Sequence, residues 1–299
     1  MKCLVCGAVT NLSIKECKDY EYGIRMPASV NLYRCESCGF CQPEKFPIDK
    51  DIGDFYPLDY ANYDSSASFV IRLLSGLYYR GQANYTKKLL SSNDASIMDI
   101  GCSDGRYLEE LSRLGFNKLY GIDVKKEIVE RLIKKGFDVK LGPIISEMYS
   151  DDKFDFIRAN HVIEHVTDPV KFLNICSSIT KKGGYLYGET PNASSIDFTI
   201  FGKYWGCGHF PRHICIFSPK ALETLAKKCG YELINIKMSS MTSGVAVGLQ
   251  NILVDKLNLK TKGGRIPIYP LLLGISIPIV QLEKIFGEAS IFEFLLRKV

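Results

Sequence analysis

Apolar and polar positions along residues 97–187 form short runs that predict strands alternating with amphipathic helices. The runs predicted as strands are residues 97–100, 119–123, 138–141, 154–157 and 185–187. Helices are predicted over 106–114 and 126–135, and each ends at a glycine, Gly115 or Gly136, as helix C-termini commonly do. This alternation predicts an α/β fold, a doubly wound Rossmann-like sheet of seven mostly parallel strands with ligands bound beyond the carboxyl ends of the strands.

Two further strands are predicted near the C-terminus, over 233–236 and 290–296, and the last fits the antiparallel strand that completes such a sheet. Between them lies an apolar insertion, about 241–287. Its second apolar run, 266–280, contains Pro267, Pro270 and Pro278 and is too short and interrupted to span a bilayer. The insertion could cover a substrate pocket, form a homodimer face or rest on a membrane.

The N-terminal 50 residues carry two C-x-x-C-G motifs, with 28 residues between them. Four thiolates in this paired spacing are typical of a structural zinc site, which stabilises a module too small for its own core. We therefore expect one Zn²⁺ bound by Cys3, Cys6, Cys35 and Cys38. Cys17 or Cys41 could replace one ligand, and reduced thiols without metal are the alternative.

Composition places the chain among globular proteins. It has 299 residues, 46% apolar and 24% charged, with a formal net charge of +5. The basic pairs are spread along the chain, which argues against one nucleic-acid-binding stripe. Eleven cysteines, without a signal-peptide pattern, favour reduced thiols and a cytoplasmic location, with peripheral membrane contact left open.

The segment 97–105 combines a buried strand, a glycine turn and the start of a helix, an arrangement that lets main-chain N–H groups approach a ligand. Asp123 follows Gly101 by 22 residues, at the end of the next strand, where an acid suits the two hydroxyls of a ribose. An ordinary strand-to-helix turn is the simpler alternative. The nucleoside could belong to NAD or to S-adenosylmethionine (SAM), but the three-glycine dinucleotide motif is missing.

Asp99 followed by Gly101-x-Ser103-x-Gly105 resembles motif I of the class I SAM-dependent methyltransferases, with Ser103 in place of a more usual glycine. Asp123 resembles their ribose-binding acid. The resemblance implies a SAM site that includes, besides these residues, Cys102, Val124, Asn160 and His161. The acid that often contacts adenine after strand three is missing, since residues 141–144 read Leu-Gly-Pro-Ile.

Residues 160–169 resemble the N-x-V-x-E-H-V-x-D-P stretch of small-molecule and sugar methyltransferases, including the ubiquinone-pathway O-methyltransferases. The resemblance covers roughly residues 55–240. With the cysteine motifs, the chain is similar to zinc-ribbon methyltransferases of surface-polysaccharide and sugar biosynthesis. We expect a zinc ribbon over 1–50, a linker and helices over 51–95, in which residues 54–63 could form a lid or pack between modules, and a methyltransferase domain over 96–299.

The four histidines, His161, His165, His209 and His213, all follow strand four or five, where a methyl acceptor should lie. A hydroxyl is a poor nucleophile, and histidine is the usual base near neutral pH. The leading candidates for the base are His165 and His213, with Glu164 orienting a neighbouring ring; a purely structural role is the alternative.

These observations predict a SAM-dependent methyltransferase that O-methylates a small-molecule or lipid-linked sugar in polysaccharide or nucleotide-sugar biosynthesis. The first alternative is an RNA methyltransferase whose zinc ribbon reads RNA, although the mild and scattered charge makes nucleic acid an unfavoured partner. The second is a non-enzymatic zinc-ribbon protein with a degenerate methyltransferase domain, against which the intact Asp99, Gly101, Gly105 and Asp123 argue.

Overall fold

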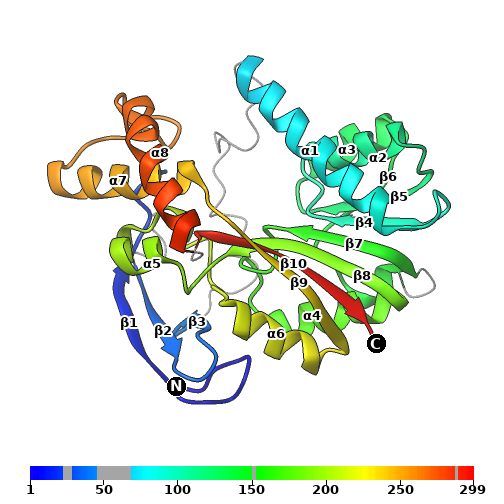
Figure 1. The fold of residues 1–299 in the computed structure, drawn as a ribbon, viewed down its shortest axis with the longest axis horizontal. Helices are drawn as coiled ribbons and strands as arrows, with labels where there is room; N and C mark the ends of the chain where they lie inside the picture. Colours follow the sequence, from blue (N-terminus) through cyan, green and yellow to red (C-terminus); the bar gives the residue numbers. More distant parts are fainter. Residues whose placement is uncertain (23–28, 46–68, 150–152, 287–288) are drawn as a thin grey trace.

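A computed structural model describes residues 1–22, 29–45, 69–149, 153–286 and 289–299, and its centre is a seven-stranded sheet (Figure 1). The strand order is β6-β5-β4-β7-β8-β10-β9. Strands β4 to β8 run parallel, and β10 is antiparallel to both of its neighbours. The predicted Rossmann-like sheet is confirmed. Its order reverses between β4 and β7, the point at which such sheets bind ligands.

The elements of the sheet domain alternate along the chain as the hydrophobic pattern predicts. In order, they are α1 (Phe69–Leu89), β4 (Ser96–Ile100), α2 (Arg106–Arg113), β5 (Lys118–Asp123), α3 (Lys126–Lys134), β6 (Asp138–Leu141), β7 (Phe154–Asn160), α4 (Pro169–Ile179), β8 (Thr180–Pro191), α5 (Ile196–Phe201), α6 (Pro219–Lys228), β9 (Tyr231–Ser239) and β10 (Ile291–Lys298). Short 3-10 turns lie at Ser146–Tyr149, Gly202–Tyr204 and Gly206–Gly208.

Both faces of the sheet are covered by helices. Along β4, Ile97 packs with the buried side chains of α2 and α3, whereas Met98 and Ile100 pack with those of α4 and α6. Successive side chains of a strand point to opposite faces, so one short strand contributes to both cores. Figure 1 shows α4 and α6 on one side of the sheet and α1, α2 and α3 on the other.

Helix starts follow the capping residues in the sequence. The side chain of Asp168 accepts a hydrogen bond from the main-chain N–H of Lys171, and Pro169 occupies the first turn of α4. Ser218 caps α6 in the same way, accepting from Ala221 N. Each cap satisfies one of the N–H groups that the first turn leaves unpaired.

Several elements are longer than the apolar pattern predicts. Strand β8 begins at Thr180, five residues before the predicted start, because Thr180 pairs with Phe154 of β7. The exposed residues Lys181 and Lys182 lie in the register shift between this pair and the pair of Tyr185 with Phe156. Strand β7 likewise extends to Asn160. The predicted linker over 54–63 lies outside the described residues.

The N-terminal module is a three-stranded antiparallel sheet of β1 (Thr10–Cys17), β2 (Val30–Cys35) and β3 (Cys41–Pro43). It packs against the segment that leads into α6. Cys41 and Ile216 exchange main-chain hydrogen bonds, and the rings of Phe40 and Phe217 lie 4.8 Å apart.

The C-terminal insertion folds as two helices, α7 (Thr242–Leu257) and α8 (Tyr269–Phe286), which pack against each other beside α5 (Figure 1). Pro278 lies inside α8, so residues 269–280 of the run that its prolines appeared to interrupt belong to one helix. Within the described part of the chain, neither of these helices nor any other is long and apolar enough to cross a membrane.

Candidate active site

The glycine turn after β4 has the backbone geometry that a close approach to a ligand needs. Gly101, Ser103 and Gly105 all have positive φ, at 72°, 47° and 81°. A Cβ at Gly105 would lie 2.3 Å from Leu132 Cδ2, and one at Gly101 would lie 3.0 Å from Val162 Cγ2. The turn therefore requires both glycines, for conformation and for space.

Asp123 at the end of β5 is tied to this turn. Its Oδ2 accepts a hydrogen bond from Ser103 N at 2.9 Å, and its Oδ1 accepts from Lys125 N at 2.9 Å. Each carboxylate oxygen has a second lone pair, which suits a pair of hydroxyl donors. The next residue, Val124, is 67% exposed at the same sheet edge.

Asp99 and Arg158 form a buried ion pair between β4 and β7. Arg158 Nη1 lies 2.8 Å from Asp99 Oδ1, and its guanidinium lies 4.6 Å from the ring centroid of Tyr107. Burial raises the pKa of Asp99 although Arg158 opposes that shift. Among the described residues, Asp99 Oδ2 has no hydrogen-bond partner. Cys102, the other predicted residue here, is buried behind the turn.

Asn160 ends β7 in a polar cluster that joins three elements. Its Nδ2 donates to Glu189 Oε2 and to the Tyr78 hydroxyl oxygen, both at 3.2 Å, and that hydroxyl donates to Glu189 Oε2 at 2.6 Å. The buried Oδ1 of Asn160 has no partner within the described ranges. An acceptor that is buried at the sheet edge and lacks a donor indicates room for a ligand N–H or O–H.

His161 and Glu164 form a hydrogen-bonded pair immediately beyond β7. Nδ1 of His161 lies 3.1 Å from Glu164 Oε1, and Thr190 Oγ1 donates to Glu164 Oε2 at 3.1 Å. The ring that Glu164 holds is thus that of His161, because the turn brings residues i and i+3 together. His161 has φ 52°, and its side chain is 37% exposed, whereas Glu164 is fully buried.

The pKa shifts of this pair reflect its contact. Burial would lower the pKa of His161, but the hydrogen bond and charge of Glu164 outweigh burial and raise it. Burial would raise the pKa of Glu164, and the contact with His161 keeps it below its usual value. The pair therefore favours an ionised carboxylate beside an unusually basic imidazole.

His165 and His213 lie together, with ring centroids 4.6 Å apart. His165 Nδ1 donates to the main-chain oxygen of Arg212 at 3.1 Å, and His213 Nδ1 donates to that of Cys207 at 2.7 Å. Burial is the chief cause that lowers the pKa of both residues, that of His213 strongly. Both imidazoles are therefore neutral at pH 7.

The fourth histidine connects the site to the N-terminal module. Glu21 Oε1 lies 2.6 Å from His209 Nδ1 and 3.1 Å from Arg212 Nη2, and Glu21 Oε2 lies 2.9 Å from Arg265 Nη1 in the insertion. Burial would raise the pKa of Glu21, but the contacts with His209, Arg212 and Arg265 outweigh burial and lower the pKa to about 2. His209 stacks edge-on against His213 at 5.2 Å.

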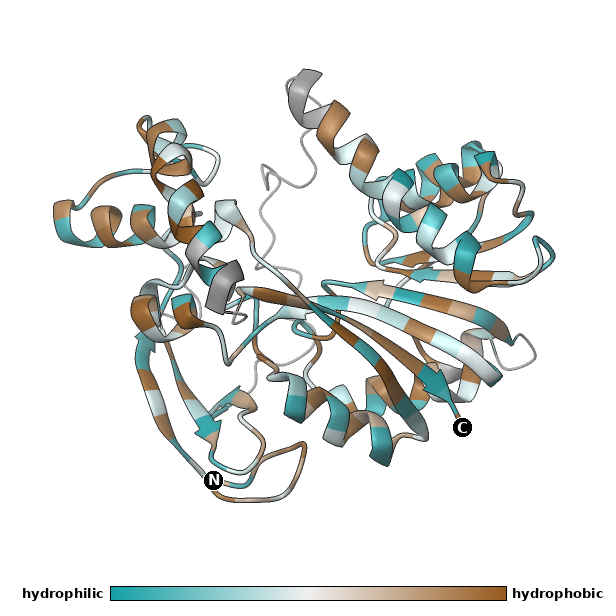
Figure 2. Ribbon diagram, viewed as in Figure 1, coloured by the Kyte–Doolittle hydropathy of each residue, from teal (hydrophilic) through white to brown (hydrophobic). Residues whose placement is uncertain are grey.

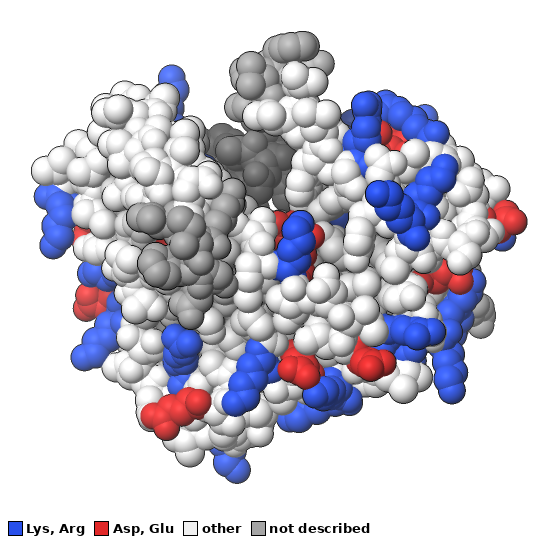
Figure 3. Space-filling view, in the orientation of Figure 1, with Lys and Arg blue, Asp and Glu red and all other residues white. Residues whose placement is uncertain are grey.

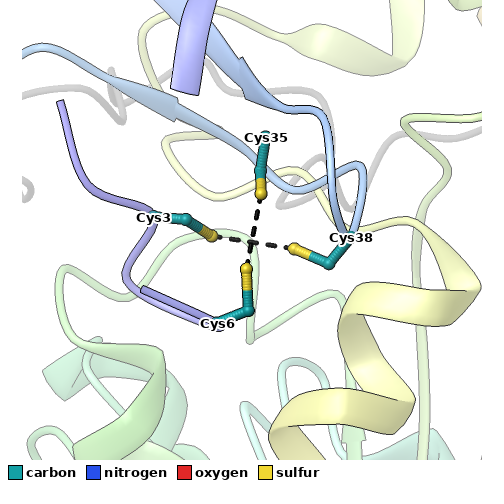
Figure 4. A group of neighbouring side chains, drawn as sticks. All are labelled: Cys3, Cys6, Cys35 and Cys38. Carbon is teal, nitrogen blue, oxygen red and sulfur yellow. Dashed lines mark hydrogen bonds between the residues drawn. The ribbon is translucent and has the colours of Figure 1, made fainter. Parts of the chain in front are cut away.

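The four cysteines of the C-x-x-C-G motifs lie around one point (Figure 4). The Sγ atoms of Cys3 and Cys38 are 3.7 Å apart, and those of Cys6 and Cys35 are 3.4 Å apart. Tetrahedral Zn²⁺ with Zn–S bonds of about 2.3 Å separates its sulfurs by about 3.8 Å. Cys17 and Cys41, the possible replacement ligands, are buried in an apolar cluster that does not include the other four cysteines.

Sequence reasoning missed three residues of the site. Tyr78 and Gln82 come from α1, where Gln82 Oε1 accepts from Arg158 Nε at 2.9 Å. Glu21 comes from the N-terminal module. None of these residues belongs to a motif, and only the folded chain brings them to the sheet edge.

Comparison with known protein families identifies the domain that contains the glycine turn and the end of β7. A sequence model of the methyltransferase domain matches residues 77–236, which is more than half of the chain. The chain belongs to this family and is a SAM-dependent methyltransferase.

Two relatives are named ubiquinone biosynthesis O-methyltransferase. The mitochondrial enzyme of Dictyostelium discoideum is 28% identical over 48% of this chain and 51% of its own length. That of Nitrosococcus oceani is 30% identical over 51% of this chain and 70% of its own length. The chain thus spans about half of the first relative. Their names give ubiquinone biosynthesis where the sequence suggested sugar or polysaccharide metabolism.

Solved structures show the same fold. A putative sarcosine dimethylglycine methyltransferase from Galdieria sulphuraria has a TM-score of 0.50 and 16% identity, covering 74% of this chain and 86% of its own. Magnesium protoporphyrin IX methyltransferase from Synechocystis with bound SAH has a TM-score of 0.50 and 12% identity, covering 83% and 94%.

The described residues fit SAM. Asp123 offers acceptors for ribose hydroxyls, the glycine turn offers main-chain N–H groups, and Asn160 Oδ1 offers an acceptor for an ammonium group. SAM, when bound, supplies an electrophilic methyl group on a sulfonium. The contacts of the predicted residues Asp99, Cys102, Ser103 and Val124 with SAM remain predictions. His161 is also predicted from the sequence as a SAM contact, and the role on the acceptor side that is proposed for it replaces that prediction.

Proposed function

We propose that this protein methylates a hydroxyl oxygen of a small-molecule acceptor and that His161 is the general base. The observation that carries the proposal is the His161–Glu164 pair at the end of β7, one residue beyond Asn160. It combines a partly exposed imidazole with a buried carboxylate at the switch point of the sheet.

The structure favours His161 over the bases expected from sequence. A carboxylate that accepts from Nδ1–H leaves the lone pair on Nε2 and stabilises the imidazolium formed when Nε2 takes a proton. His165 and His213 donate Nδ1–H to main-chain carbonyls instead, and their pKa values are lowered. They are therefore weaker bases than His161.

The transfer is a single displacement. The acceptor oxygen forms a bond to the methyl carbon as the carbon–sulfur bond breaks, and the sulfur keeps the electron pair. The hydroxyl proton passes to His161 Nε2, and Glu164 stabilises the resulting positive charge. Thr190 and the main-chain N–H groups of Ile214 and Cys215 hold Glu164 in place.

We leave the acceptor class to experiment because the family match covers 77–236. Glu21, which contacts His209, and Arg265, which contacts Glu21, lie outside it. Labelled methyl transfer from SAM should be measured into nucleotide sugars, lipid-linked glycans, a lipid extract with ubiquinone precursors, and total RNA. Label in the ubiquinone pool would extend the relatives' names to this chain, and label in a sugar pool would support the sequence-based class. Label in RNA alone would contradict the proposal.

We propose that Cys3, Cys6, Cys35 and Cys38 bind one structural Zn²⁺. The spacing of their sulfurs, and the three short strands around them, support it. Four thiolates leave no open coordination position, so this zinc stabilises the module and takes no part in the transfer.

We also propose that the exposed face of α8 contacts a membrane surface. Residues 266–282 contain no charged residue, and Leu271, Ile275 and Ile277 are between 47% and 62% exposed. Figure 2 shows α8 as largely hydrophobic, and Figure 3 shows few charged side chains on this part of the surface. The exposed Lys256, Lys260 and Lys262 in the preceding segment suit anionic lipid.

Flotation with anionic vesicles tests this proposal. Wild type should float with the vesicles, and the double variant Leu271→Asp/Ile275→Asp should not. A stable dimer that ignores vesicles would assign the face to a second copy instead.

A further inference from the structure

Glu164, His165 and His213 form a second group of potential metal ligands, separate from the cysteine cluster. One potential ligand atom of each lies within 4.8 Å of those of the other two. Glu164 is fully buried and His213 is 6% exposed. In the described part of the chain, these three residues and the four cysteines are the groups with such an arrangement.

The hydrogen bonds of both imidazoles orient them as metal ligands are oriented. A neutral histidine whose Nδ1–H donates to a carbonyl carries its lone pair on Nε2. His165 and His213 both donate in this way, to main-chain oxygens at 3.1 and 2.7 Å. Metal-binding histidines use the same kind of outer partner to fix the ring and its tautomer.

The carboxylate is supported in the same manner. His161 Nδ1 and Thr190 Oγ1 each contact one oxygen of Glu164. The main-chain oxygen of Glu164 accepts from Ile214 N and Cys215 N at 2.9 and 3.1 Å, which fixes the turn after β7 against the loop that carries His213. The ligand atoms thus come from two segments that the main chain itself joins.

The nearest arginine does not oppose a cation here. The guanidinium of Arg212 is paired with Asp19 at 3.5 Å and with Glu21 at 3.1 Å, so its charge is compensated on the side of the N-terminal module. The carboxylate of Glu164, which contacts His161 and Thr190, would be shared between His161 and a cation beside the two rings.

We propose that Glu164, His165 and His213 bind one divalent transition-metal cation through a carboxylate oxygen and two imidazole nitrogens. Two nitrogens and one oxygen suit Zn²⁺, Mn²⁺, Fe²⁺ or Co²⁺ better than Mg²⁺. Three protein ligands leave coordination positions open. In catalysis, which rests on the O-methyl transfer proposed above, an acceptor hydroxyl at an open position would lose its proton to His161 more readily.

Titration with Co²⁺ tests the site directly. Purified protein that retains zinc in its cysteine cluster is freed of weakly held metal and titrated by calorimetry and visible absorption. We expect one Co²⁺ per chain, with the weak absorption of nitrogen and oxygen ligands and without thiolate-to-cobalt charge transfer. His213→Gln and Glu164→Gln should weaken Co²⁺ binding about tenfold or more, since even loss of outer-shell partners has effects of that size.

The matched control is His209→Asn, because its ring lies 5.2 Å from that of His213 but outside the ligand set. It should bind Co²⁺ as wild type does, and SAM binding by every variant shows that each is folded. Absence of Co²⁺ binding outside the cysteine cluster, or equal binding by His213→Gln and wild type, would overturn the proposal. Methyl transfer without Co²⁺ binding would remove this inference alone, whereas Co²⁺ binding without transfer to any hydroxyl would remove the proposed function alone.

Discussion

Nδ1 of His161 lies 3.1 Å from Oε1 of Glu164, and the two residues share the turn that follows β7. Glu164 is fully buried, while the side chain of His161 is 37% exposed. This relationship gives His161 both a carboxylate partner and access to solvent. His209, whose side chain is 23% exposed, has Glu21 as its partner, and that carboxylate also contacts Arg212 and Arg265.

The pH dependence of the transfer should follow His161. Its pKa is raised, because the contact with Glu164 outweighs burial, and the base works only when unprotonated. Activity at saturating SAM should therefore rise with pH through a midpoint above the ordinary value for histidine, about 6.5. In Glu164→Gln the midpoint should move to lower pH, because the neutral amide no longer stabilises the imidazolium. An unchanged midpoint would show that another group titrates.

Asp123→Ala should weaken SAM binding about tenfold or more, since hydrogen bonds to a carboxylate contribute about 1.5–3 kcal/mol. The variant loses the acceptor for ribose and the contact that ties Ser103 N to β5. Calorimetry with SAM measures the effect. Glu127→Ala, at an exposed position in the next helix, is the matched control and should bind SAM normally. Normal SAM affinity in Asp123→Ala would place the ribose elsewhere.

Cys35→Ser should remove zinc from the N-terminal module, and Cys41→Ser should not. Cys35 belongs to the group of four sulfurs, whereas Cys41 is equally buried but packs in a different cluster. Metal analysis of the purified proteins should give about one Zn²⁺ per chain for wild type and Cys41→Ser. Wild-type protein without zinc would contradict the site.

Glu21→Gln should destabilise the fold by about 3–5 kcal/mol, the usual cost of breaking a buried ion pair. Glu21 contacts His209 and compensates the charges of Arg212 and Arg265 at once. Its pKa is lowered to about 2, so its stabilisation is present above the unfolded value of about 4.3 and is lost as the pH falls toward 2. Urea unfolding at pH 7 and pH 3 should show a smaller difference between variant and wild type at the lower pH.

The sequence was sufficient for the sheet and for the glycine turn at its edge because those signals are local. The apolar run of β4, the positive-φ glycines and the acid at the end of β5 lie within 27 residues, from Ile97 to Asp123. Asp168 and Pro169 marked the start of α4 for the same reason. Capping and turn chemistry depend on neighbours in the chain.

The arrangement of the acceptor side could not be predicted in the same way. Glu21 and His209 are 188 residues apart, and Tyr78 and Glu189 are 111 apart. Only packing of the N-terminal module and of α1 on the sheet brings them together. Four clustered histidines were evident from the sequence, but which of them contacts Glu164 depends on the turn after β7.

The most direct test of the account is the transfer rate of His161→Asn at saturating SAM, measured beside SAM affinity by calorimetry. General-base catalysis contributes about 100- to 10,000-fold, so kcat should fall by at least about 100-fold. SAM affinity should change by less than about threefold, because the imidazole acts on the acceptor. A variant that retains wild-type kcat, or that loses SAM binding in parallel with kcat, would contradict the assignment of His161 as the base.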